Sequence, residues 1–165
     1  MSTVTLRQID EELLPRVLEA AVSGTDPAEA MPPVPGPPGW TPERRAAFGD
    51  FHRRTAGPSY AIMTGEEIIG ATRLTPAEAP GAAEIGIWLT RQARGKGHSV
   101  AALHQLIEEA RAQGKTALIA ETNAANPAAV GLLRTLGAKL WEDPDTGAVH
   151  ATLRVGDSVE HGIGR

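Results

Sequence analysis

Hydrophobic and polar positions alternate along this chain with two different periods, and the switches between them predict its elements. Residues 3–9 alternate with period two, which predicts a first strand. A helix is expected after Asp10, where Pro15 either lies late in the first turn or marks the true start. The apolar positions that recur there at helical spacing are Leu14, Val17, Leu18 and Ala21.

The next segment, residues 24–40, is too rich in proline for a helix or a strand and is expected to be a long loop. Thr41 then begins a second helix as its cap, with Pro42 in the first helical position, and this helix should run to about Thr55. Its basic residues are expected to form a solvated face: Arg44, Arg45, Arg53 and Arg54.

The remaining pattern predicts a hairpin and then alternating helices and strands. The expected strands are 60–64, 68–75, 82–90, 116–121, 138–141 and 148–155, and the expected helices follow Ser99 and Asn126. Gly86 lies inside a strand, which often marks a bulge or a close backbone approach. This order predicts an α/β fold with a mixed sheet, formed as a single domain by residues 1–155, and a loose tail at 156–165.

Residues 92–99 join a strand to a helix through a glycine-rich loop. Gly95 and Gly97 allow the backbone to approach a ligand closely, and the helix that follows directs its unpaired N–H groups into the same space. Such a site favours a phosphate or pyrophosphate. The loop does not fit a Walker motif, because Thr90 stands where its first glycine should be, nor a dinucleotide motif, because Val100 replaces the third glycine.

The loop instead fits Gln/Arg-x-x-Gly-x-Gly/Ala, and with its flanks it resembles the GNAT superfamily of N-acetyltransferases. The flanks are Glu84-Ile85-Gly86-Ile87-Trp88-Leu89 before the loop, and the run from Glu121 to Val130 with Leu136-Gly137 after it. The resemblance covers about residues 83–140 in order and spacing. It implies the GNAT acyl-CoA N-acyltransferase fold, a central splayed mixed sheet with helices on both faces, and acetyl-CoA as co-substrate.

The resemblance also implies which residues hold acetyl-CoA. The main chain of Ile87, Trp88 and Leu89 would pair with the pantetheine arm, and Asn126 would hydrogen-bond to it. The pyrophosphate would lie against the loop residues Arg94, Gly95, Lys96, Gly97, His98 and Ser99. In many GNAT proteins a Tyr on the next helix protonates the leaving thiolate. Leu133 occupies that position here, and the one Tyr of the chain, Tyr60, lies on an early strand, so the general acid is unassigned.

Transfer to an amine also needs a proton acceptor, because an amine with a pKa of about 10.4 is almost wholly protonated at neutral pH. Glu84 and Glu121 are the candidate catalytic residues, one on each of the two strands expected to splay apart. Each could equally be structural: Glu84 as an exposed strand residue, Glu121 as a carboxylate that caps a loop N–H.

Composition and charge exclude several kinds of site and partner. The 165 residues contain no cysteine, which excludes disulfides and thiolate zinc sites, and the five histidines lack ligand spacing, so no metal is expected. A net charge of −4 argues against nucleic acid as the main partner. The sequence has no apolar run approaching about 18 residues and no signal-like N-terminus, so a soluble, cytoplasmic protein is expected. Its expected oligomeric state is a monomer or a homodimer.

The expected acceptor is a small polycationic amine, and an aminoglycoside or related aminosugar antibiotic is one such acceptor, which would make the chain a resistance enzyme. The reason is a set of carboxylates on segments that can converge in the GNAT fold: Asp26, Glu29, Glu84, Glu121, Glu142, Asp143 and Asp145. The proline-rich segment would be either a lid over this site or a solvated loop. Two alternatives remain open: an enzyme that acetylates protein N-termini or lysines, and a non-catalytic acyl-CoA sensor.

Overall fold

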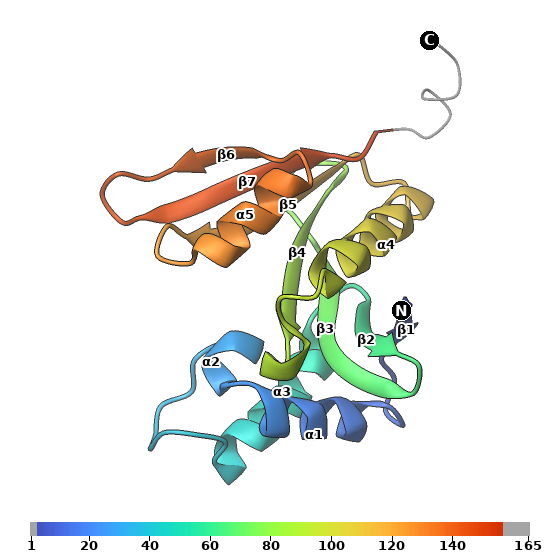
Figure 1. Ribbon diagram of the computed structural model, residues 1–165, viewed down its shortest axis with the longest axis vertical. Helices are drawn as coiled ribbons and strands as arrows, with labels where there is room; N and C mark the ends of the chain where they lie inside the picture. The colour runs from blue at the N-terminus through green and yellow to red at the C-terminus, as the bar shows by residue number, and fades with distance from the viewer. Residues whose placement is uncertain (1–2, 157–165) are drawn as a thin grey trace. The chain divides into compact units, whose positions relative to one another are not determined.

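The computed structural model describes residues 3–156, and the contacts within it divide the chain into two compact units. The first unit contains the residues up to Arg73 together with Ile87–Ala102, and the second contains Leu74–Gly86 together with the residues from Leu103 onward. The strands form a seven-stranded sheet in the order β1-β2-β3-β4-β5-β7-β6 (Figure 1).

The elements follow the predicted order with two additions, a short helix in the proline-rich segment and a 3-10 turn after the fourth strand. The strands are β1 (Val4–Gln8), β2 (Ser59–Thr64), β3 (Glu67–Pro76), β4 (Ala82–Leu89), β5 (Ala117–Asn123), β6 (Lys139–Glu142) and β7 (Ala148–Arg154). The helices are α1 (Leu14–Gly24), α2 (Pro27–Ala30), α3 (Pro42–Arg54), α4 (His98–Ala112) and α5 (Pro127–Thr135), with a 3-10 turn η1 (Arg91–Ala93).

The sheet is mixed, as predicted. Strands β1 and β2, β2 and β3, β5 and β7, and β6 and β7 pair antiparallel, whereas β4 and β5 pair parallel. Two parallel strands in sequence need a crossover, and the long helix α4 supplies it. The parallel register joins Ala82, Ala83 and Glu84 to Ala117, Leu118 and Ile119, and both strands continue beyond these three pairs.

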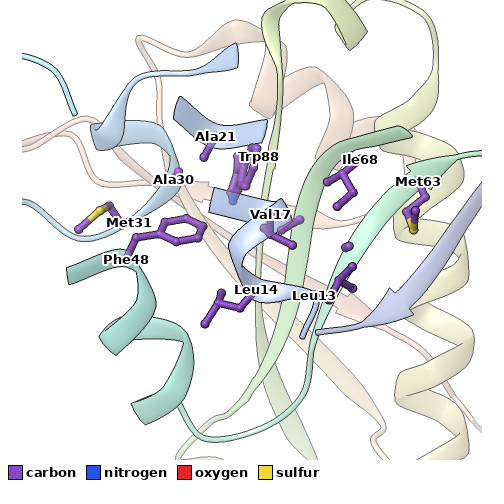
Figure 2. Packing of buried hydrophobic residues seen from close by; sticks show 12 residues of the cluster. Leu13, Leu14, Val17, Ala21, Ala30, Met31, Phe48, Met63, Ile68 and Trp88 are labelled. Carbon is purple, nitrogen blue, oxygen red and sulfur yellow. The ribbon is translucent and has the colours of Figure 1, made fainter. Parts of the chain in front are cut away.

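In the core of the first unit, aliphatic side chains of α1 pack with Phe48 of α3 and Trp88 of β4 (Figure 2). Phe48 of α3 is fully buried and lies edge-on to Trp40 and Trp88, at centroid distances of 5.8 and 6.5 Å. Leu14 and Val17 of α1 are buried in the same cluster, at the helical spacing that the sequence showed. This core buries one side of the end of β4, from which the glycine loop departs.

The start of α1 was open between two positions, and the structure places it at Leu14. The Asp10 carboxylate accepts a hydrogen bond from the Leu13 amide at 2.8 Å, and Pro15 lies in the first turn. Proline is tolerated there because its missing N–H would have had no partner within the helix.

The proline-rich segment is more ordered than the prediction of a plain loop. Asp26 precedes the one-turn helix α2, whose first residue is Pro27. The Arg44 guanidinium, expected in solvent, instead donates hydrogen bonds to main-chain carbonyls of the segment, those of Val34 at 2.8 Å and Gly39 at 2.7 Å among them. The segment is therefore held against α3 by one side chain that satisfies several of its carbonyls.

The second unit has its own buried surface. Ala83 of β4, Leu118 of β5 and Leu106 of α4 are each at most 1% exposed, and α5 packs against β5 and β6 (Figure 1). The tail expected at residues 156–165 lies outside the described residues except for Gly156. Within residues 3–156 we find no helix that combines the length and apolar character needed to span a bilayer.

Candidate acetyl-CoA site

The predicted strand–loop–helix junction is present in the first unit. Strand β4 ends at Leu89, the turn η1 follows, and α4 begins at His98 directly after the two glycines (Figure 1). Gly95 and Gly97 have φ values of +76° and +81°, a region that side-chain-bearing residues adopt at a cost. Glycine at both positions therefore allows the loop to adopt this left-handed backbone conformation.

The start of α4 presents backbone donors at the loop. The first hydrogen bond of the helical ladder there runs from the Ala101 amide to the Gly97 carbonyl at 3.2 Å, so the amides of residues 98–100 precede that ladder. These amides and the positive end of the helix dipole form the arrangement that binds phosphate groups at helix starts. Lys96 is exposed and adds a positive charge to the same loop.

Arg94 makes internal contacts instead of facing the loop's ligand. Its guanidinium donates to the Leu89 carbonyl at 3.1 and 2.9 Å, to the Thr25 hydroxyl at 3.1 Å and to the Glu29 carboxylate at 2.8 Å. Its amide donates to the Arg91 carbonyl at 3.3 Å. Because both polar parts of Arg94 have partners within the chain, Gly95–Ser99 are the stronger candidates for anion contacts.

The end of β4, which carries Ile87, Trp88 and Leu89, is fixed to β3. The Thr90 amide donates to the Ile69 carbonyl at 2.9 Å, and a Cβ atom on Gly70 would lie 2.1 Å from the Trp88 carbonyl oxygen. Only glycine permits so close an approach of two backbones. The structure has such an approach at Gly70 on the neighbouring strand, and the bulge or close approach expected at Gly86 stays a prediction.

Glu84 and Glu121 both lie in the second unit and share one face of its sheet. Glu84 pairs with Ile119 in the parallel register, and Glu121 follows two residues later on β5, so the two carboxylates point to the same side. Both side chains are exposed. A face that carries two solvated carboxylates can hold a cation or accept a proton.

The same face carries an aromatic pair that the sequence analysis missed. His150 of β7 pairs with Glu121 on one side and Trp141 of β6 on the other, so the three residues form one row across the sheet. The rings of Trp141 and His150 lie 5.6 Å apart, and Trp141 is 59% exposed. Alternation within β6 could have indicated the face of Trp141, but only the register shows what lies beside it.

Asn126, Leu133 and Tyr60, which the sequence analysis considered for the site, each have a structural place. The Asn126 side chain caps α5 by accepting a hydrogen bond from the Ala129 amide at 3.1 Å. Leu133, at the position of the family's Tyr, is buried in α5, and Tyr60 is buried in β2, within the first unit. Neither of these two residues can serve as an exposed acid, because Leu133 has no ionisable group and Tyr60 is buried.

The carboxylates expected to line an acceptor cleft are not equivalent. Asp26 forms an ion pair with Arg91 at 2.7 Å and Glu29 forms one with Arg94 at 2.8 Å, so both are neutralised locally. Asp143 accepts a hydrogen bond from the Asp145 amide and shapes the β6–β7 turn. Glu142 follows Trp141 on β6 and points to the opposite face. Glu84 and Glu121 remain as the pair with a shared exposed face.

The described residues contain no group of three His, Asp or Glu side chains placed to hold a metal ion. Burial lowers the pKa of His52 in α3 to about 4, and the nearby charge of Arg73 lowers it further. His52 packs on Phe48 and Phe51, away from the loop residues described above. It therefore belongs to the core.

Comparison with known proteins agrees with this geometry. The family profile of the Acetyltransferase (GNAT) domain matches residues 3–139. The chain belongs to this family of acetyl-CoA-dependent N-acetyltransferases. No curated protein sequence matches it at a significant level.

Solved structures share the fold at low sequence identity. The GNAT domain of PAT from S. lividans is 21% identical with a TM-score of 0.73, over 92% of this chain and 90% of that one. RimL, a ribosomal L7/L12 α-N-protein acetyltransferase solved with coenzyme A, is 20% identical with a TM-score of 0.72, over 93% and 95%. The spermidine/spermine N-acetyltransferase of Vibrio cholerae is 13% identical with a TM-score of 0.70, over 98% and 99%.

Proposed function

We propose that this chain, as one catalytic domain over residues 1–155, transfers the acetyl group of acetyl-CoA to a primary amine of a small polycationic acceptor. The observation that carries the acceptor class is the pair Glu84 and Glu121, exposed on one face of the sheet of the second unit. Two carboxylates on one face attract a cation with several ammonium groups.

In this proposal the loop and the start of α4 hold the pyrophosphate. The backbone amides of Gly95–Ser99 donate to it and Lys96 adds charge, as the φ values of the glycines and the start of the helix ladder support. The main chain of Ile87–Leu89 pairs with the pantetheine arm, and the recorded pairing of β4 with β5, which ends at Glu84, is consistent with that role. The Asn126 amide group contributes a further hydrogen bond.

The chemistry requires a neutral amine. Glu84 or Glu121 takes a proton from the ammonium group, directly or through water, and the amine nitrogen then attacks the thioester carbonyl carbon. A main-chain N–H of β4 stabilises the oxyanion, and the nitrogen of the tetrahedral intermediate loses its second proton to solvent. The C–S bond then breaks to leave the neutral amide, and coenzyme A departs as a thiolate that solvent protonates. No side-chain acid is assigned, because Leu133 stands where many relatives carry Tyr.

Aminosugar antibiotics such as aminoglycosides, and linear polyamines, are the two kinds of acceptor that fit this proposal. The exposed Trp141 next to His150 adds a ring face that can contact a cation, although Lys139 lies two residues away on the same strand and works against it. The likeness to the spermidine/spermine enzyme is compatible with a polyamine, and the likeness to RimL keeps a peptide N-terminus as the competing acceptor.

An acceptor panel tests the proposal. Purified protein is incubated with acetyl-CoA and, separately, with aminoglycosides including kasugamycin-like compounds, with spermidine, and with a peptide bearing a free N-terminus. Thiol release and product mass are measured. We expect acetylation of a polycationic small molecule. Robust acetylation of the peptide alone contradicts the acceptor, and absence of thiol release with every amine favours an acyl-CoA sensor.

A further inference from the structure

A cluster of polar side chains in the first unit joins the glycine loop to the proline-rich segment. Thr25 is 2% exposed, its hydroxyl donates to the Glu29 carboxylate, and the same hydroxyl accepts from Arg94 at 3.1 Å. The Trp40 indole N–H donates to the Thr25 carbonyl at 2.9 Å. We call Thr25, Glu29 and Arg94 the loop clasp.

Within the loop clasp, the Arg94 side chain folds back onto the end of β4. Arg94 lies five residues after Leu89, and its guanidinium returns to the Leu89 carbonyl through two hydrogen bonds. The Glu29 carboxylate accepts a hydrogen bond from the same guanidinium at 2.8 Å. A long arginine side chain loses much rotamer freedom in such a position, so it needs partners on more than one side to stay there.

The Glu29 carboxylate can keep the Arg94 guanidinium in place because it is negatively charged. The Thr25 hydroxyl, and secondarily the Arg94 charge, lower the pKa of Glu29, so the side chain is ionised at neutral pH. A second ion pair, Asp26 with Arg91 at 2.7 Å, joins the same two segments on the solvent side. Both pairs link residues that are 65 positions apart in sequence.

We infer that Glu29 is a positioning residue for the acetyl-CoA loop. It holds Arg94 against Leu89 and thereby fixes the backbone between β4 and α4 in the form that presents the amides of Gly95–Ser99. This inference rests on the proposed role of the loop. It also makes Arg94 a brace of the loop, which leaves Lys96 as the cation that faces the pyrophosphate.

The negative charge of Glu29 has an opposite, electrostatic effect on the affinity for acetyl-CoA. Removing Glu29 also removes a negative charge near a site for an anion, which by itself would tighten binding. The Glu29 and Arg94 side chains are 47% and 41% exposed, and a charge so exposed is strongly screened. Ordering several residues of backbone costs more free energy than one screened charge supplies, so the loss of positioning should dominate.

The test compares Glu29→Ala, Glu29→Gln and the control Glu11→Ala. Glu11 forms an exposed ion pair with Arg53 at 2.9 Å in the same unit and is not part of the loop clasp. With the acceptor held constant, we expect Glu29→Ala to raise the KM for acetyl-CoA about tenfold and to change kcat less than twofold. Glu29→Gln keeps an acceptor oxygen for Arg94 and should recover most of the affinity, while Glu11→Ala should stay within twofold of the wild type.

Acetylpantetheine separates positioning of the loop from general damage. It carries the thioester without the pyrophosphate, so its kcat/KM should be the same in the wild type and in Glu29→Ala. An unchanged or lower KM for acetyl-CoA in Glu29→Ala contradicts the inference, and so does an equal loss with both substrates. The double variant Glu29→Ala, Arg94→Met should bind acetyl-CoA no worse than Arg94→Met alone, because Glu29 acts through Arg94.

Failure of this inference is distinguishable from failure of the proposed loop. If a side chain at Gly97 abolishes acetyl-CoA binding while Glu29→Ala has no effect, the loop binds the pyrophosphate without help from the clasp. If neither change affects binding, the loop itself is the wrong site.

Discussion

His52 is a half-buried histidine of α3 whose surroundings oppose its charged form. Its ring lies 4.6 Å from that of Phe48, and its Nε2 atom has no hydrogen-bond partner within residues 3–156. Burial lowers its pKa from 6.5 to about 4. The unfolded chain therefore binds a proton in a pH range where the folded protein does not, and folding stability must fall as the pH drops through that range.

We predict a loss of about 3 kcal/mol in unfolding free energy between pH 7 and pH 4 from this residue, since each pKa unit is worth about 1.36 kcal/mol. The stability is fully present above the unfolded pKa near 6.5 and is lost as the pH falls toward 4. Urea unfolding at several pH values measures it. The variant His52→Leu cannot titrate and should show a correspondingly flatter pH dependence. Identical slopes in the two proteins would contradict the burial of a neutral imidazole.

The proposed role of Glu84 and Glu121 as proton acceptors is tested by single substitutions. Replacing the base by an amide should lower kcat at pH 7 by about 10²-fold or more, because general base catalysis contributes 10²–10⁴-fold. The loss should shrink at higher pH, where the amine is already neutral. Glu84→Gln and Glu121→Gln are compared across pH, with acetyl-CoA affinity as the control. Full activity of both variants at every pH shows that the proton leaves by another route.

At the scale of elements, the junction of β3 and β4 depends on a glycine. A Cβ atom at Gly70 would meet the Trp88 carbonyl oxygen at 2.1 Å and the Leu89 Cα at 3.1 Å, and neither backbone can move without breaking strand pairing. We predict that Gly70→Ala lowers the unfolding free energy by about 2 kcal/mol or more.

Gly131 in α5 is the matched control for that change. An added Cβ there meets no heavy atom within 4 Å, and alanine favours a helix by about 1 kcal/mol over glycine. Gly131→Ala should therefore raise the unfolding free energy. Urea unfolding measures both variants. If Gly70→Ala is equally harmless, the two strands do not approach as closely as described.

Elements with a clear period were predictable from sequence, and the exceptions have physical causes. The strands and α3 were placed correctly because their alternation and the Thr41-Pro42 start are local signals. Helix α2 was missed because the prolines of the whole segment outweighed a local start signal, with Asp26 before Pro27 and Glu29 in the first turn. The clasp was not predictable, because hydrogen bonds between residues 65 or more positions apart leave no periodic trace.

At the scale of the whole chain, the family was predictable because one loop motif and the order of its flanking elements identify it. The acceptor was not, because it depends on which side chains meet from distant segments. Of the carboxylates expected around it, Asp26 and Glu29 turned out to be paired with arginines, and Trp141 and His150 were not expected to adjoin Glu121. Net charge alone could not separate paired from unpaired carboxylates.

The most direct test of the account is the affinity of the protein for acetyl-CoA when the loop glycine is changed. Gly97 and Gly114 both have a φ of +81° and open space where a Cβ would lie, so valine strains the backbone similarly at either position. Gly114 follows α4 at its far end from the loop.

Calorimetry with acetyl-CoA should show binding to the wild type and to Gly114→Val, and a loss of at least about tenfold in affinity for Gly97→Val, which corresponds to about 1.4 kcal/mol. The side chain at residue 97 would occupy the space the pyrophosphate needs and distort the amides that bind it. Affinity that is unchanged in Gly97→Val, or lost equally in Gly114→Val, would contradict the claim that this loop binds acetyl-CoA.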